Sequence, residues 1–125
     1  MTAGEPMGKT AGKIKLKRVY EECDPGDGRR ILVDRLWPRG LSKERARVDW
    51  WLKEIAPSDG LRRWFGHDPS RWQEFKASYR EELQAQRPLL DELRSLAAKE
   101  SITLLYAAKD LEHNNARVLI ELLGQ

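Results

Sequence analysis

Charged and polar side chains follow two apolar segments of this chain, at the point where each segment ends. Ile31-Leu32-Val33 gives way to Asp34, Arg35 and, after a short turn, Arg39. The apolar run 104–108 gives way to Lys109, Asp110, His113, Asn114 and Asn115. In open α/β sheets, ligands bind beyond the carboxyl ends of the strands. We therefore expect the two polar groups to share one site if the two strands are adjacent and parallel.

Three cations in these groups predict an anionic ligand. Arg35, Arg39 and Lys109 supply positive charge, and the backbone N–H groups of a helix starting near Asn114 add to it. Phosphate, carboxylate and nucleotide ligands all match this chemistry, and Trp37 can stack on a planar one. The expected ligand contacts are therefore Arg35, Trp37, Arg39, Lys109 and Asn114.

Acid–base chemistry is a further possibility at the same site. Asp34, Asp110 or His113 would be the acid or base, and the neighbouring cations would stabilise developing negative charge. The sequence leaves open whether the protein is an enzyme and names no cofactor.

Each of these residues also has a purely structural interpretation. Asp34 and Arg35 can pair as a salt bridge, and Asp110 can be the N-cap of the last helix. For Asn114 the structural alternative is helix capping. We expect His67 to pack on Trp72 rather than to transfer protons.

The elements that position these residues are predicted from hydrophobic spacing and capping signals. A strand opens at Ile14, two further apolar strands are those described above, and alternation over 48–52 predicts another. The second half is mostly helical, with start signals at Ser58 and Asp68 and an earlier helical turn after Ser42. The loop 21–28 is too short for a crossover helix, so the first two strands are antiparallel or not direct neighbours.

These elements predict a small single α/β domain, with a partly mixed, three-layer sheet of three to four strands covered by helices. The chain has 125 residues, the size of one domain. Residues 1–12 are expected to form a flexible tail and residues 13–125 the domain.

Composition excludes several classes of protein. No apolar stretch approaches the roughly 20 residues that a transmembrane helix needs, and no secretory signal precedes the domain, so we expect a cytoplasmic protein without a membrane partner. One cysteine, Cys23, cannot form an internal disulfide. No cysteine or histidine spacing of the zinc type occurs, and no metal site is expected.

Basic residues concentrate in the N-terminal half, although the net charge is only +3. The segment 29–47 contains seven Lys or Arg residues and two acidic residues. This excess supports a second hypothesis, a nucleic-acid-binding or regulatory module, although no recognised nucleic-acid motif accompanies it. A third hypothesis is a structural adaptor with an exposed apolar patch. The oligomeric state is open.

Several segments of the chain closely resemble one family of bacterial proteins. They are Val33–Lys43 (VDRLWPRGLSK), Ala56-Pro57-Ser58, Trp64–Asp68 (WFGHD), Thr103–Asp110 (TLLYAAKD) and His113–Ala116 (HNNA). They resemble the YeaO-like family, a domain of unknown function, with similarity from about Ile14 to Leu123. The resemblance implies a compact α/β domain and brings no established activity, cofactor or catalytic residue.

Overall fold

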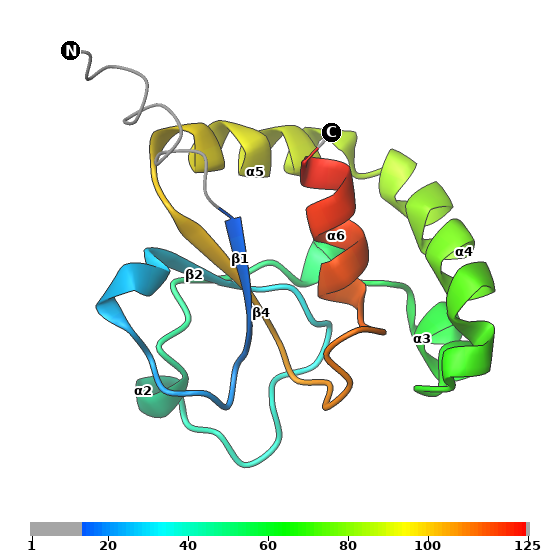
Figure 1. Cartoon of the computed structure of the whole chain (residues 1–125), viewed down its shortest axis with the longest axis horizontal. Helices are drawn as coiled ribbons and strands as arrows, with labels where there is room; N and C mark the ends of the chain where they lie inside the picture. The colour runs from blue at the N-terminus through cyan, green and yellow to red at the C-terminus, as the bar shows by residue number, and fades with distance from the viewer. Residues whose placement is uncertain (1–13, 125) are drawn as a thin grey trace.

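Four short strands form one parallel sheet at the centre of the protein (Figure 1). The structure is a computed structural model that describes residues 14–124; the tail predicted over residues 1–12 lies outside the described residues. The strands are β1 (Ile14–Arg18), β2 (Arg29–Leu32), β3 (Trp50–Trp51) and β4 (Ile102–Tyr106), in the spatial order β1-β4-β2-β3. The predicted α/β class and strand number are confirmed.

The sheet is parallel throughout, so the prediction of a partly mixed sheet was wrong. Strand β4 lies between β1 and β2, with Leu104 opposite both Leu16 and Ile31. The chain between β1 and β2 therefore runs back across β4 instead of forming a hairpin. Of the two alternatives for the first two strands, the structure has the second: they are not direct neighbours.

The longer helices all cover one face of the sheet. They are α3 (Asp59–Phe65), α4 (Trp72–Gln84), α5 (Arg87–Lys99) and α6 (Asn115–Leu123). Their apolar side chains form the main core with alternate strand residues such as Ile31, Leu104 and Tyr106. In Figure 1 these helices surround the upper and right-hand sides of the sheet. Within residues 14–124, every helix is too short or too polar to cross a bilayer.

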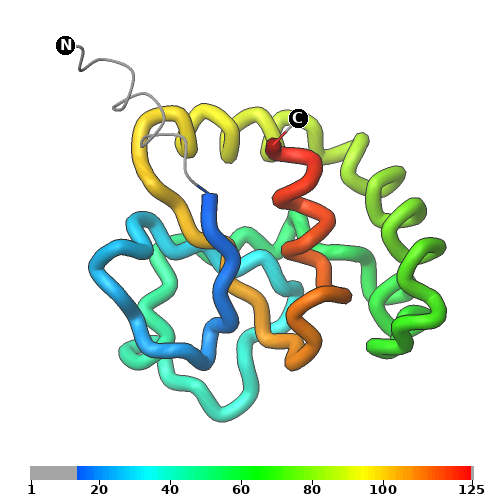
Figure 2. Tube along the Cα trace, viewed as in Figure 1, coloured from blue at the N-terminus to red at the C-terminus, as the bar shows by residue number. Residues whose placement is uncertain are grey.

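Connecting segments cover the opposite face, where helices had been expected. A second, smaller core contains Val19, Leu32, Ala46 and Leu105. The one α-helix on this side, within residues 14–124, is the single turn α2 (Lys43–Ala46), and the tube in Figure 2 shows the long connections around it. The reason is topological: the β1–β2 and β2–β3 connections cross this face, while the longer β3–β4 connection carries α3, α4 and α5 across the other.

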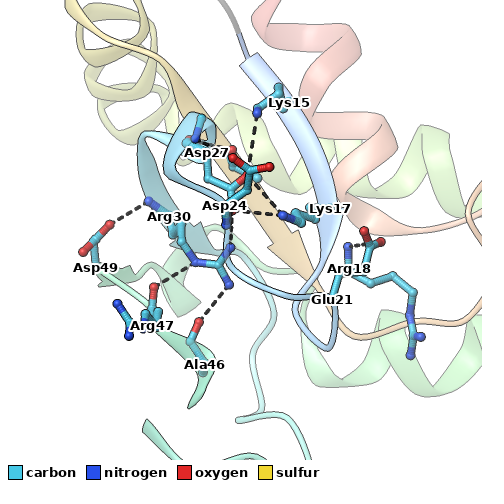
Figure 3. A network of polar contacts seen from close by, with 12 residues as sticks. Lys15, Lys17, Arg18, Glu21, Asp24, Asp27, Arg30, Ala46, Arg47 and Asp49 are labelled. Carbon is cyan, nitrogen blue, oxygen red and sulfur yellow. Dashed lines mark hydrogen bonds and ion pairs between the residues drawn. The ribbon is translucent and has the colours of Figure 1, made fainter. Parts of the chain in front are cut away.

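A buried ion cluster holds the β1–β2 connection against the sheet (Figure 3). Asp27 is 1% exposed and forms ion pairs with Lys15, Lys17 and Arg30. Its backbone carbonyl accepts a hydrogen bond from the hydroxyl of Thr103 on β4 (2.7 Å). Arg30 is itself buried and donates to the backbone carbonyls of Ala46 (2.8 Å) and Arg47 (2.9 Å) at the end of α2. The cluster thus joins both connections on this face to the strands.

Helix starts follow the predicted capping residues. The Ser42 hydroxyl accepts from Arg45 N–H (3.2 Å) at α2, and the Ser58 hydroxyl accepts from Leu61 N–H (3.2 Å) at α3. Asp68 caps the short 3₁₀ turn η3 (Pro69–Arg71), which leads directly into α4. Two other 3₁₀ turns are η1 (Pro25–Asp27) and η2 (Lys53–Ile55).

Candidate functional site

The ends of β2 and β4 open onto a cavity of about 750 Å³. Ligand sites in proteins are typically of about 300–1,000 Å³. Because β2 and β4 are adjacent and parallel, the residues that follow them lie at the same edge of the sheet. The cavity is lined by all the predicted site residues: Asp34, Arg35, Trp37, Arg39, Lys109, Asp110, His113 and Asn114. The structure therefore brings the two polar groups together.

Asp34 connects the ends of the two strands. Its Oδ2 accepts a hydrogen bond from the backbone N–H of Ala107 (2.9 Å), and the side-chain amide of Asn115 donates to the carbonyl of Val33 (2.9 Å). Burial raises the pKa of the Asp34 carboxyl, against the opposing effects of the Ala107 N–H, the Asn115 amide and the charge of His67. Asp34 is thus a half-buried acid on the cavity wall.

Asp34 and Arg35 do not form the salt bridge that was one alternative. The Nε of Arg35 donates to the carbonyl of Pro57 (3.2 Å). Among residues 14–124, neither side chain has an ion-pair partner. Two residues adjacent in the chain thus bring opposite charges to one cavity without neutralising each other.

Arg39 and Lys109 are exposed cations at the same cavity. The hydroxyl of Tyr20 donates to the backbone carbonyl of Arg39 (2.9 Å), which holds the loop in place. Within the described part of the chain, neither Arg39 nor Lys109 pairs with a carboxylate. Together with Arg35, they leave three positive charges at the cavity that carboxylates do not compensate.

Trp37 has a structural role as well as a place on the cavity wall. Its indole N–H donates to the carbonyl of Leu41 (2.6 Å), and its ring packs edge-on against Trp51, with 5.4 Å between centroids. Trp37 thus belongs to the smaller core and presents the rest of its surface to the cavity.

Asp110 orients His113. The Oδ1 atom of Asp110 accepts from the backbone N–H groups of Glu112 (2.9 Å) and His113 (3.0 Å), while its Oδ2 lies 2.9 Å from Nδ1 of the His113 ring. The hydrogen bond from the Glu112 N–H, followed by that from the His113 ring, lowers the pKa of Asp110. The imidazole also packs edge-on against Trp72. A carboxylate-oriented imidazole can accept a proton or donate a hydrogen bond to a ligand.

Asn114 is the N-cap of α6. Its Oδ1 accepts from Arg117 N–H (3.0 Å), its Nδ2 donates to the Asp110 carbonyl (2.9 Å), and the residue is 3% exposed. The capping alternative for Asn114 is therefore what the structure contains. Asp110, the other N-cap candidate, caps the turn that precedes the helix.

Several cavity residues were not among the predicted set. They are Tyr20, Leu36, Pro38, Pro57, Arg62, Arg63, Phe65, Gly66, His67, Phe75, Ala107 and Ala108. Arg62 and Arg63 both pair with Asp59 at the start of α3 (3.1 and 3.3 Å). Hydrophobic spacing predicts the helix that carries these arginines, but gives no sign that its end reaches the strand ends.

His67 was expected to pack on Trp72, and this was wrong. The His67 ring lies nearest Phe65, with centroids 6.3 Å apart, and His113 takes the position against Trp72. Gly66 and His67 both have positive φ angles (54° and 59°), so the chain turns sharply after α3. Gly66 was a recognisable helix stop, but a second left-handed residue, at a histidine, had no signal in the sequence.

Metal binding has no geometric support in this region. Within residues 14–124, no three His, Cys, Asp or Glu side chains are grouped so that they could hold a metal ion.

The chain matches one family model over residues 13–125, the family described as "Inactive DUF488-N3 subclade". It belongs to this family, DUF488-N3i. Two similar proteins are the uncharacterized protein Rv3073c of Mycobacterium tuberculosis (strain ATCC 25618 / H37Rv) and the uncharacterized protein YeaO of Escherichia coli (strain K12). Both are 43% identical, over 112 and 110 residues, which are 90% and 88% of this chain and 94% and 96% of theirs. No solved structure gives a significant match.

Membership of DUF488-N3i confirms the resemblance to YeaO-like proteins. Both relatives named above are uncharacterized, so neither assigns a role to any residue of the cavity.

Proposed function

We propose that the cavity binds an anionic small molecule, a phosphate, carboxylate or nucleotide, through Arg35, Arg39 and Lys109. The observation that carries this proposal is the convergence of these three cations on one cavity, without carboxylate partners among the described residues. Like charges grouped at one concave site raise the local positive potential, which favours an anionic ligand.

The overall charge of the cavity supports the same ligand class. Its lining has five Arg or Lys residues and two carboxylates, Asp34 and Asp110. One of the two, Asp110, already faces His113. Helix α6 begins at the cavity wall, where its dipole and free N–H groups favour negative charge.

Binding without turnover is the form of the proposal that the chain supports best. The family description calls this subclade inactive. The side chain of Asn114 caps α6, and one oxygen of Asp34 accepts the hydrogen bond from the Ala107 N–H. If the protein does catalyse a reaction, the Asp110–His113 pair is the candidate acid or base, with Asp34 as the second carboxyl group.

A small molecule is favoured over nucleic acid because four basic residues of the N-terminal half are held by contacts within the fold. Lys15, Lys17 and Arg30 converge on Asp27, and Arg18 donates to the carbonyls of Ala107 (3.0 Å) and Ala108 (2.9 Å). These side chains are therefore less free to follow a phosphate backbone.

Calorimetric titration with ethyl phosphate, acetate and adenosine monophosphate tests the proposal. We expect at least one of them to bind, and Arg39→Ala and Lys109→Ala each to weaken binding about tenfold, the effect of losing about 1.5 kcal/mol of charge-assisted hydrogen bonding. Lys99→Ala is the matched control, because it removes an exposed cation at the far end of α5, outside the cavity. Absence of binding, or equal affinities in all variants, would contradict the proposal. Affinity only for DNA or RNA, falling steeply with salt, would favour the nucleic-acid alternative.

A further inference from the structure

Among the described residues, Asp34 forms no ion pair, and three of the cations that line the same cavity form none either. The cations are Arg35, Arg39 and Lys109, and none of them forms an ion pair with Asp34 or with another carboxylate in the described region. The opposite charges of one cavity are thus kept apart rather than paired with one another.

The fold itself maintains this separation. On one side, the Ala107 N–H binds Oδ2 of Asp34, and the indole N–H of Trp51 donates to the Asp34 carbonyl (2.9 Å), which fixes the backbone there. On the other side, Arg35 is turned to the carbonyl of Pro57. The two side chains thus have different hydrogen-bond partners.

The remaining surroundings of Asp34 do not neutralise it either. Oδ2 is engaged by the Ala107 amide. Neighbouring groups that act on the carboxyl are the amide of Asn115 and the ring of His67, which is exposed. Burial raises the pKa of Asp34 despite these neighbours, and a cation placed beside the carboxylate would stabilise its charged form.

We infer that the ligand of this cavity has two ends, an anionic group that contacts Arg39 and Lys109, and an ammonium or other N–H donor group that contacts the carboxylate of Asp34. This inference rests on the proposed function, and it narrows the ligand class to amine-bearing phosphates or carboxylates. The volume of about 750 Å³ is large enough for a small amine-bearing phosphate or carboxylate, and Phe65 and Phe75 line the cavity for its apolar part.

Paired ligands that differ in one group test the inference. The probes are ω-aminoalkyl phosphates with chains of two to four carbons, each compared with the alkyl phosphate of the same length. An alkylamine is protonated at pH 7, like a lysine side chain. We expect at least one aminoalkyl phosphate to bind the wild-type protein about tenfold more tightly than its alkyl counterpart.

Asp34→Asn is the variant that assigns this preference to one residue. Asn retains an oxygen for the Ala107 N–H and removes the charge, so the preference should fall to near onefold, while alkyl phosphate affinity is retained or increased. Glu112→Gln makes the same change in net charge outside the cavity lining and should preserve the preference.

The outcomes separate the inference from the proposed function. Equal binding of both ligand series to the wild-type protein would overturn the two-ended ligand and leave the anion site standing. Binding of neither series, with no binding of acetate or adenosine monophosphate either, would overturn both. A preference that survives in folded Asp34→Asn would overturn the role of Asp34, and if that variant does not fold, the wild-type comparison alone still decides whether the ligand has two ends.

Discussion

The backbone N–H of Ala107 donates a 2.9 Å hydrogen bond to Oδ2 of Asp34, and this contact joins the segments that leave β4 and β2. Directly after β2, the backbone N–H of Val33 donates a hydrogen bond to the Leu105 carbonyl of β4 (3.1 Å). A side chain thus continues the pairing of the two strands past their ends. The cavity wall depends on this contact, because Asp34 and Ala107 both line it.

Asp34→Ala should lower the free energy of unfolding by about 1–3 kcal/mol, because the Ala107 N–H loses its acceptor. Asp34→Asn should cost clearly less, since an amide oxygen can replace Oδ2. Urea denaturation of the three proteins at pH 7 measures both differences. Equal losses in the two variants would show that the hydrogen bond does not stabilise the fold.

Asp27→Asn should be among the most destabilising single changes in the chain, by about 3–5 kcal/mol, because it leaves the buried Arg30 charge without its partner. Burial tends to raise the pKa of Asp27, but hydrogen bonds from Asp24 N–H, Lys17 and Arg30 together outweigh it and lower the pKa below 3.8. The folded state therefore holds the Asp27 proton less tightly than the unfolded chain.

This difference gives a pH dependence of known sign. Asp27 contributes its full stabilisation above the unfolded pKa of 3.8, and the contribution disappears as the pH falls through the lower folded pKa. Urea unfolding of the wild-type protein between pH 6 and pH 2 should include this loss. Asp27→Asn should have a flatter profile, and parallel profiles for the two proteins would argue against a depressed pKa.

Gly28→Ala should destabilise the protein, whereas Gly60→Ala should not. Gly28 has φ +64°, and a Cβ there would lie 2.2 Å from the carbonyl oxygen of Ser101. The strain should cost about 1–3 kcal/mol. Gly60 lies in α3 with open space around it, so alanine should stabilise the helix by up to about 1 kcal/mol. Thermal melting compares the two, and a stable Gly28→Ala protein would be incompatible with this close approach.

Asn114→Ala should destabilise the protein by about 1–2 kcal/mol through loss of the α6 N-cap. Asn114→Ser keeps an oxygen for Arg117 N–H and should lose less than half as much. Chemical denaturation measures the stability, and hydrogen exchange at the Arg117 amide reports the cap itself. If serine and alanine behave alike at this amide, Asn114 does not act as a cap.

The location of the candidate site could be predicted because two apolar runs end abruptly in charge. Ile31-Leu32-Val33 and the run 104–108 have the composition of strands buried on both faces, and parallel neighbours end at one edge. Local capping residues such as Ser42 and Ser58 were also sufficient to predict where α2 and α3 begin, because a cap depends on residues within one turn of it.

The sheet order could not be predicted, because it depends on contacts between residues far apart in the sequence. Strand β4 enters between β1 and β2, where Thr103 binds the Asp27 carbonyl and Gly28 lies against Ser101. No local pattern encodes these pairings. The place of His67 in the cavity lining could not be predicted for a similar reason. The packing of α3 and the turn after α3 bring His67 to the ends of β2 and β4, which precede and follow it in the chain.

The central claim, that this cavity is an anion site, is tested most directly by mapping amide chemical shifts during titrations with ethyl phosphate, acetate and adenosine monophosphate. With at least one of these anions we predict saturable shifts concentrated in the amides that line the cavity, from Ala107 to Lys109 and at Arg39 and Asn115, while the amides at the opposite ends of the strands, near Arg29 and Ile102, stay unchanged. No saturable shift at the cavity with any of the three anions, or equal shifts at both ends of the strands, would contradict the account.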